Sequence, residues 1–332
     1  MRPLKIAIIG TGSVAKNNYL PFLSRQEQVS LSYFSRTKAK AEACQQKFGG
    51  KACDSLADLM ADQPDSVLLL TNEDQRYDVA CQVLEFNPKR LFMEKPLHAR
   101  LGQAQVTEND FFEACELMRR AEQQGVETAM MFNYRFFEVS AKLREVLAGR
   151  NTGPLRQATL YVNYACWSHC LDLLQHFGGD VTTVQALNGS VSYGSGRQQG
   201  TDLAAAFLLA NGATGTVLGT SGSLFKLSLY HLILNFEHAM IVIDDLDSRL
   251  ELNFDNSNYR ESYSLQPNFS RWNQYASSFE KALAAYLQSL EQNAPPPVPG
   301  RAGLAELQLE AALRRSARLQ AAVNVQQDFP MS

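Results

Sequence analysis

The chain has 332 residues, enough for about two domains that each bury a core of their own. Its composition, 45% hydrophobic and 20% charged, is that of an ordinary globular protein, and its formal net charge of −3 argues against a general nucleic-acid or anionic-membrane binder. No apolar run approaches the roughly 18 residues that a membrane-spanning helix needs, so we expect a cytoplasmic protein that binds neither nucleic acid nor membrane.

Six cysteines are spread along the chain without the spacing of a disulfide framework, which favours reduced thiols. Cys166 and Cys170 have the most suggestive spacing, because residues four apart share one face of a helix. His169, Asp172 and His176 lie nearby, so a metal site is geometrically conceivable. No second well-spaced pair of cysteines or histidines accompanies them. We therefore interpret these cysteines as packing residues and expect no metal.

The chain begins with a strand that leads through a glycine-rich turn into a helix. The apolar run Ile6–Ile9 predicts the strand, and Gly10-Thr11-Gly12-Ser13-Val14-Ala15 follows it. In such a unit Gly10 permits the tight turn, Gly12 lets the backbone approach a pyrophosphate, and Ala15 lets the helix pack closely. The free N–H groups at the start of the helix favour negative charge. This stretch therefore predicts a dinucleotide-binding turn.

The second strand, predicted over Val29–Phe34, ends at the residues that select the coenzyme. A carboxylate about twenty residues beyond the glycines usually binds the ribose hydroxyl of NAD. This chain instead carries Ser35-Arg36-Thr37-Lys38, whose two hydroxyls and two cations suit a 2′-phosphate. We therefore expect NADP, with NAD possible. The alternative is a solvated loop that enters a helix over Lys38–Phe48.

Two later strands also end at polar residues. The run Ser66–Thr71 is a buried strand, and the loops after strands of a doubly wound sheet face the ligand, so Thr71 and Asn72 are expected near the coenzyme. The strand Arg90–Met93 ends in Glu94-Lys95-Pro96. Hydride transfer to or from a nicotinamide requires a group that moves a proton on the substrate oxygen. Lys95 is our candidate for that group, and Glu94 is expected to orient the loop or the coenzyme.

The second half of the chain changes character near residues 149–154, where Gly, Asn and Pro concentrate. Before that point, the polar stretch Gln103–Asp110 is interpreted as a surface insertion. After it, apolar runs joined by short turns predict antiparallel strands at 155–165, 183–193, 204–209, 214–221, 227–236 and 239–244. Two long helices, 272–292 and 302–322, complete the chain.

Several motifs occur in one consistent order: the glycine turn, Tyr19-Leu20-Pro21-Phe22, Thr71-Asn72, Glu94-Lys95-Pro96, Asn133-Tyr134-Arg135-Phe136, His169-x-x-Asp172 and Pro297–Gly300. Together they resemble the glucose–fructose oxidoreductase, inositol dehydrogenase and rhizopine catabolism (Gfo/Idh/MocA) family. The resemblance implies an α/β Rossmann domain, a doubly wound parallel sheet, followed by an α+β domain with a large open, mostly antiparallel sheet. We assign them to residues 1–125 and 126–332, with a linker region at 126–154 and the helix 302–322 able to pack back on the first domain.

The resemblance also implies an NAD(P)-dependent oxidoreductase that usually acts on a sugar or polyol. It assigns proton transfer to Lys95 together with His169. The residues expected to contact the substrate are Tyr134, Arg135, Trp167 and Asp172. Two departures stand out, because Ala165 replaces an aspartate of the family and the glycine-rich loop before His169 is missing. A larger or more open substrate site follows as a hypothesis.

The sequence thus predicts an NADP-dependent dehydrogenase or reductase that transfers hydride to or from a sugar-like or polyol carbonyl or alcohol. Two alternatives stay open: reduction of a C=N or C=C bond in a larger substrate, and a non-catalytic NADP-sensing regulator. Because the open sheet face of the second domain needs cover, we also expect a homo-dimer or homo-tetramer.

Overall fold

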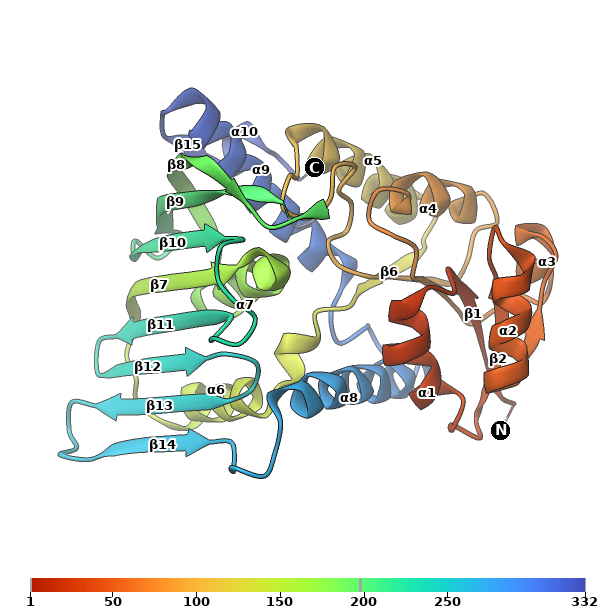
Figure 1. The fold of residues 1–332 in the computed structure, drawn as a ribbon, viewed down its shortest axis with the longest axis horizontal. Coiled ribbons are helices and arrows are strands. Elements are labelled where there is room, and N and C mark those ends of the chain that lie inside the picture. The colour runs from red at the N-terminus through yellow and green to blue at the C-terminus, as the bar shows by residue number, and fades with distance from the viewer. Residues whose placement is uncertain (1, 197–198, 332) are drawn as a thin grey trace.

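The computed structural model describes residues 2–196 and 199–331 and contains two sheets with helices between and around them (Figure 1). The first sheet has six strands in the order β3-β2-β1-β4-β5-β6, and every pair in it is parallel. The strands are β1 (Leu4–Ile9), β2 (Val29–Phe34), β3 (Lys51–Ala52), β4 (Ser66–Leu69), β5 (Arg90–Met93) and β6 (Glu127–Met130). The strand order reverses between β1 and β4, which opens a crevice at their carboxyl ends. The expected doubly wound parallel sheet is confirmed.

Helices connect these strands, because a parallel strand requires a crossover over the face of the sheet. They are α1 (Leu20–Leu23), α2 (Lys38–Phe48), α3 (Leu56–Ala61), α4 (Arg76–Leu84) and α5 (Glu108–Gln123). A π-helical turn over Ala15–Tyr19 precedes α1 and continues into it. This turn directs Tyr19, which is fully buried, toward the end of β5.

The stretch Gln103–Asp110 is not a surface insertion, so that prediction was wrong. Ala104 and Val106 are only 1% and 3% exposed. Thr107 caps α5 reciprocally with Asp110: the Thr107 hydroxyl accepts from the Asp110 N–H, and the Asp110 carboxylate accepts from the Thr107 N–H at 2.7 Å. Because these polar groups satisfy one another, Asp110 is buried together with Ala104 and Val106, while Gln105 and Asn109 stay exposed.

The second sheet has nine strands in the order β14-β13-β12-β11-β7-β10-β9-β8-β15. Its pairs are antiparallel except for β7 and β10, which are parallel. The strands are β7 (Leu155–Asn163), β8 (Val181–Tyr193), β9 (Gly200–Leu209), β10 (Thr214–Thr220), β11 (Tyr230–Phe236), β12 (Ala239–Asp244), β13 (Arg249–Phe254), β14 (Arg260–Ser264) and β15 (Val323–Asn324). The expected large, mostly antiparallel sheet is confirmed.

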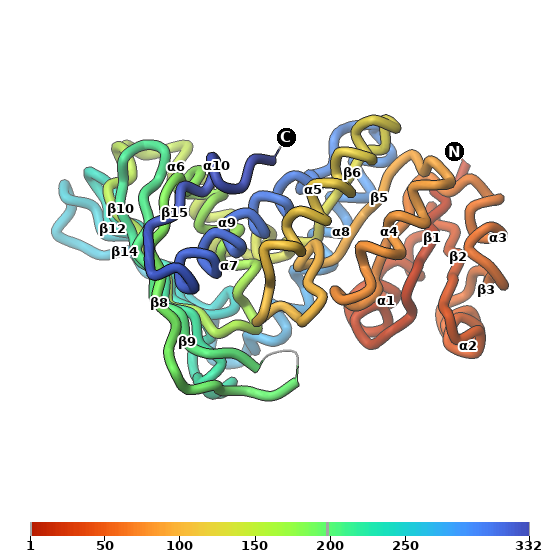
Figure 2. Tube along the Cα trace, turned by 90° about the horizontal axis from the view of Figure 1, so that it is seen from above, coloured from red at the N-terminus to blue at the C-terminus, as the bar shows by residue number. Residues whose placement is uncertain are grey.

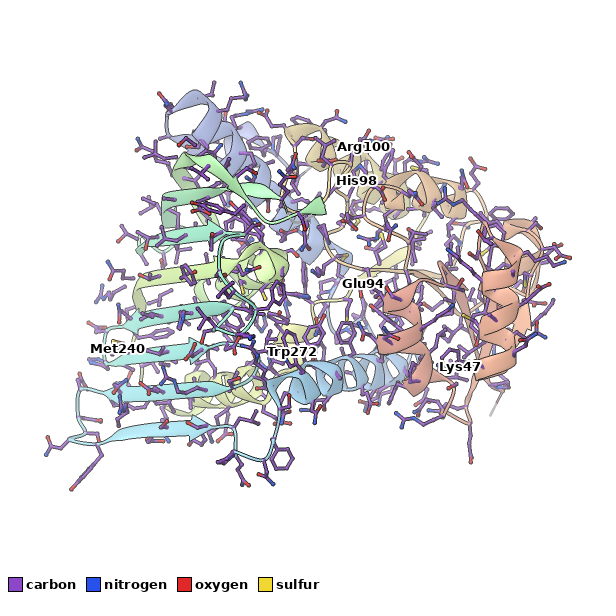
Figure 3. All side chains as sticks on the ribbon, in the orientation of Figure 1. Lys47, Glu94, His98, Arg100, Met240 and Trp272 are labelled. Atoms are coloured by element: carbon purple, nitrogen blue, oxygen red, sulfur yellow. The ribbon has the colours of Figure 1, made fainter. Side chains whose placement is uncertain are left out.

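One face of the nine-stranded sheet is covered and the other is open. The remaining helices are α6 (Glu138–Gly149), α7 (Trp167–Gly178), α8 (Arg271–Glu291), α9 (Gly300–Leu319) and α10 (Val325–Asp328). Helices α7 and α9 lie on the face directed toward the first sheet (Figure 2). Burial alternates along β9, β10 and β12, as expected for a sheet with one covered face. The outward side chains include Leu187, Leu208, Leu218 and Met240, the last labelled in Figure 3.

Helices α8 and α9 join the two halves. Helix α8 packs on the first sheet, where the hydroxyl groups of Tyr286 and Ser66 are 2.6 Å apart and Arg90 donates to the Ser289 hydroxyl. Helix α9 contacts α5 and β6 of the first half and α7 and β8 of the second. Strand β6 itself extends the parallel sheet into the 126–154 stretch that we expected to link the domains.

The turn between β12 and β13 anchors two helices. Asp247 accepts hydrogen bonds from the N–H groups of Glu138 and Val139, so a distant carboxylate caps the start of α6. Asp245 accepts from the N–H of Leu229 and pairs with Arg271 at the start of α8. This turn therefore fixes where both helices leave the sheet.

No helix in the described ranges is long and apolar enough to cross a membrane. All six cysteines are free thiols, in keeping with the absence of a disulfide pattern in the sequence. The cytoplasmic location stays a prediction.

Candidate active site

Two adjoining cavities lie at the carboxyl ends of β1, β4 and β5. One, of about 400 Å³, reaches from the glycine turn to the ends of β2 and α4. The other, of about 290 Å³, reaches from the same turn to the end of β5 and to α8. They share Gly12, Leu70, Thr71 and Asn72. The glycine turn therefore stands at the middle of one continuous crevice.

The two glycines of the turn have different surroundings. A Cβ on Gly10 would lie 2.8 Å from backbone atoms of Leu70 and Thr71, and the φ of Gly10 is +94°. This glycine is needed for the close approach of the turn to the loop after β4. A Cβ on Gly12 would meet no atom within 4 Å, because it would project into the crevice. Gly12 thus leaves open the space that a pyrophosphate would take.

Other residues of this region also fit a dinucleotide. The hydroxyl oxygen of Thr71 is buried and has no hydrogen-bond partner among the described residues, whereas the buried hydroxyl of Thr11 interacts with the thiol of Cys44. The Thr71 hydroxyl is therefore ready to bind a polar ligand. Ser13 and Val14 line the smaller cavity, whereas Ala15 is fully buried and packs in the core beneath the turn. Their roles in coenzyme binding stay predictions.

The four residues expected to select the coenzyme separate into two pairs. Ser35 and Arg36 line the larger cavity. Thr37 and Lys38 do not, and the Lys38 ammonium lies 2.6 Å from the Asp54 carboxylate on the outside. Lys40 also lines the cavity, although the sequence gave no reason to single it out. Arg36 and Lys40 therefore bring two cations to this end of the crevice.

Lys95 lies at the other end of the crevice and is held by hydrogen bonds. Its ammonium donates to the Gln103 side-chain oxygen at 3.0 Å, and the Gln103 amide donates to the backbone oxygen of Tyr164 at 3.1 Å. The Glu94 carboxylate, which lies between the two sheets in Figure 3, accepts from the N–H of Lys95 and from the Tyr19 hydroxyl at 2.5 Å. Glu94 thus orders the loop that carries Lys95.

Arg76 connects the two loops that bound the smaller cavity. Its buried guanidinium donates to the backbone oxygens of Thr71, after β4, and of Pro96, after β5. Burial lowers the pKa of Arg76, and the nearby Glu94 carboxylate opposes that shift. Arg76 therefore holds the two ligand-facing loops together.

His169 lies on α7 and is only 2% exposed. Its ring stacks on Tyr134 with the centroids 4.1 Å apart, and Phe132 meets it edge-on. Neither ring nitrogen has a hydrogen-bond partner in the described part of the chain. Burial, and then the charge of Lys95, lower the pKa of His169 well below its usual value. The structure therefore brings a neutral imidazole into the electrostatic range of Lys95, behind the cavity rather than on its wall.

The four residues assigned to substrate contact make contacts within the protein. Arg135 and Asp172 form a two-armed ion pair at 2.6 and 2.8 Å, and burial raises the pKa of Asp172 to about 6 against the effect of Arg135. The Tyr134 hydroxyl donates to the Cys166 sulfur at 3.1 Å. The indole of Trp167 is 1% exposed and donates to Glu310. None of the four lines the smaller cavity, so their substrate roles stay predictions that this placement does not support.

Several residues of the crevice were missed by the sequence analysis. Besides Lys40 and Arg76, they include Asn18, Gln103 and Tyr275. Gln103 lies in the stretch interpreted as an insertion, and Tyr275 comes from α8, almost two hundred residues after Lys95. Their positions follow from tertiary packing, for which the local sequence carries no signal.

Residues 4–128 match the family model described as the oxidoreductase family with an NAD-binding Rossmann fold. This segment belongs to the Gfo/Idh/MocA family. The matched segment contains the glycine turn, the loop after β4 and the Glu94-Lys95-Pro96 motif, and the family resemblance inferred from the sequence is thereby confirmed. No curated protein sequence matches the chain at a significant level.

Solved structures share the fold along nearly the whole chain. The WlbA dehydrogenase of Bordetella pertussis, in complex with NADH and UDP-GlcNAcA, is 18% identical with a TM-score of 0.79 and covers 97% of this chain and 98% of its own. An oxidoreductase from Agrobacterium radiobacter, in complex with NAD+, L-tartaric acid and magnesium, is 18% identical with a TM-score of 0.80, covering 98% and 99%. A super-repressor mutant of Gal80p from Saccharomyces cerevisiae is 14% identical with a TM-score of 0.81, covering 98% of each chain. At these identities the likeness establishes that the chain shares the two-domain fold of these proteins.

Proposed function

We propose that this protein is an NADP-dependent oxidoreductase that transfers hydride to or from a sugar-like carbonyl or alcohol. The observation that carries the proposal is the position of Lys95, whose ammonium lies in a cavity continuous with the glycine turn of an NAD-binding Rossmann fold. Structures of similar fold are described as complexes with NADH and UDP-GlcNAcA or levoglucosan, which supports a sugar-like substrate.

The coenzyme, when bound, donates or accepts the hydride. The chain supplies the proton transfer: the Lys95 ammonium gives a proton to the substrate oxygen during reduction, and the neutral Lys95 amine takes a proton from the substrate hydroxyl during oxidation. Gln103 and Glu94 hold Lys95 in place through its side chain and its backbone N–H. We assign His169 to proton transfer behind Lys95, since its neutral imidazole can accept a proton at one nitrogen and release one from the other.

Lys95→Met tests the mechanism, because methionine keeps the length of the side chain and removes its charge. We expect loss of hydride transfer, with coenzyme affinity changed by less than about threefold, since the pyrophosphate turn is untouched. Lys142→Met serves as the control, because Lys142 is a surface lysine of α6 paired with Glu145. Turnover by the Lys95 variant at the wild-type rate would remove Lys95 from the mechanism.

The NADP preference rests on Arg36 and Lys40, two cations at the end of the crevice beyond the glycine turn. A 2′-phosphate there would make charge-assisted hydrogen bonds that NAD cannot make. Arg36→Ala should weaken NADP binding roughly tenfold and leave NAD binding nearly unchanged, as measured by calorimetry. Equal weakening of both coenzymes, or tighter binding of NAD to the wild-type protein, would contradict the preference.

One feature favours a second candidate, a coenzyme-sensing regulator without turnover. The connection between β7 and α7 is a single short turn over Tyr164–Cys166, and Ala165 within it provides no acid or base. Gal80p, a repressor by its description, shares the fold. Stoichiometric NADP binding without hydride exchange across sugars, polyols, imines and activated alkenes would favour the regulator. The same panel identifies a C=N or C=C reductase by its product.

We also propose that the open face of the nine-stranded sheet forms a homo-dimer or homo-tetramer. The face carries Leu187, Leu208, Leu218 and Met240, each at least 38% exposed. Apolar side chains on an uncovered sheet are stabilised when a second copy buries them. Light scattering should give a mass of two or four chains, and Leu208→Lys should lower it. A monomer in the wild-type protein would refute the proposal.

A further inference from the structure

Helix α9 buries a carboxyl group that no group in the described part of the chain binds. Glu306 is 0% exposed, and neither of its oxygens has a hydrogen-bond partner among residues 2–196 and 199–331. Its helix is held against α7 at this level, where the Gln175 amide donates to the Ala305 backbone oxygen. A buried carboxyl group without a hydrogen-bond partner destabilises the folded state, because burial removes its hydration without replacement. Such a group in a folded protein therefore calls for an explanation.

The surrounding polar groups show the same pattern. On α7, both ring nitrogens of His169 and the hydroxyl of Ser168 are buried and likewise without a described partner. Three buried polar side chains on two helices that pack together are thus unsatisfied. All lie in the half of the molecule that faces Lys95, whose charge acts on both His169 and Glu306.

The neighbouring carboxylates differ from Glu306 because each has a cation. Glu310, one turn further along α9 and equally buried, pairs with Arg314 and accepts from the Trp167 indole. Asp172 of α7 pairs with Arg135. Lys95, which Gln103 already engages, is the cation that acts on Glu306. The charged groups on the other helices packed against α9 interact with residues other than Glu306. Asp110 of α5 acts on Glu310, and Glu108 of α5 and Asp328 of α10 face Arg315.

These surroundings determine the charge of Glu306. Burial, and then the negative charges of Glu310 and Asp172, raise its pKa well above the usual range. This shift favours the protonated, neutral form of a carboxyl group on which the charge of Lys95 also acts.

We propose that Glu306 is a proton-holding residue of the active site, which keeps its proton while the coenzyme ring beside Lys95 is neutral and releases it when that ring is positively charged. In the release step the carboxyl O–H bond breaks, the proton leaves to solvent, and no electron is transferred. This inference rests on the proposed function, since it requires a nicotinamide ring next to Lys95. Glu306 itself does not touch the substrate.

The proposal predicts a link between pH and the oxidation state of the bound coenzyme. Binding that releases a proton becomes tighter as the pH rises, by up to tenfold per pH unit for one full proton. We therefore expect the affinity for NADP+, relative to that for NADPH, to increase between pH 6 and pH 8. The 2′-phosphate titrates near pH 6 in both forms, so taking the ratio removes its contribution.

The test is calorimetric titration of the full-length protein with NADP+ and with NADPH at three pH values, in two buffers of different protonation enthalpy. Glu306→Gln should abolish the pH dependence of the affinity ratio, and Glu306→Asp, which retains an ionisable group, should restore most of it. Glu306→Met, of similar length, replaces the glutamine variant should the latter not fold.

A wild-type ratio that does not change with pH, although both coenzymes bind, would overturn the inference and leave the proposed function standing. Persistence of the pH dependence in the glutamine variant would overturn it too, because another group would then be the source of the proton. Binding of neither coenzyme would overturn the proposed function and this inference together.

Discussion

Gly12→Ala should weaken coenzyme binding without destabilising the folded protein. The added methyl group meets no atom within 4 Å, and Gly12 does not have a left-handed backbone, so we expect unfolding free energy equal to wild type or up to about 1 kcal/mol higher. The methyl does occupy the space where a pyrophosphate would contact the turn. Loss of one charge-assisted hydrogen bond there costs about 1.5–3 kcal/mol, which corresponds to about ten- to a hundredfold weaker coenzyme binding.

Alanine at position 10 is the matched comparison. There the methyl would lie 2.8 Å from backbone atoms of Leu70 and Thr71, and φ is +94°. Strain and overpacking should together destabilise the protein by about 2–5 kcal/mol. Urea unfolding and fluorescence titration with NADPH measure the two quantities. Full coenzyme affinity in the Gly12 variant, or wild-type stability in the Gly10 variant, would refute this account of the turn.

Three further predictions concern the second domain. Asp247→Ala should lower unfolding free energy by about 1–2 kcal/mol in urea, because α6 loses its cap; an unchanged midpoint would contradict this. Arg135→Met should cost about 3–5 kcal/mol because Asp172 is left buried without its cation, and a loss below 1 kcal/mol would argue against the pair. Folding lowers the pKa of His169, so its contribution to stability is present above about pH 6.5 and is lost as the pH falls below that value. Between pH 7 and pH 5.5 the unfolding free energy of the wild type should therefore fall by about 1 kcal/mol more than that of His169→Phe. Equal losses in the two proteins would refute this prediction.

The first domain was largely predictable from sequence because its signals are local. Strand β2 and helix α2 have the predicted bounds, since β2 alternates polar with apolar residues and ends in two aromatic residues, and its helix follows shortly after. The position of Lys95 also followed from strand and motif alone. The glycine turn could be predicted from the spacing of Gly10 and Gly12 alone, because only glycine allows the backbone to pass so close to other groups.

The second domain and the inner part of the site were less predictable. Strands β13 and β14, over Arg249–Ser264, were not predicted. Charged residues interrupt the apolar pattern of both strands, and β14 is exposed at the edge of the sheet. Trp167 and Asp172 have partners, Glu310 and Arg135, that are far away in the sequence. No local pattern distinguishes a side chain bound to such a partner from one that awaits a ligand.

The side-chain amide of Gln103 bridges the two halves of the molecule. Its oxygen accepts a hydrogen bond from the Lys95 ammonium of the first half, and its nitrogen donates one to the backbone oxygen of Tyr164 in the second. A hinge movement that parts the halves would have to stretch this bridge. If Lys95 is the proton donor, as proposed, its position depends on contact between the two halves, because Gln103 is bound to both.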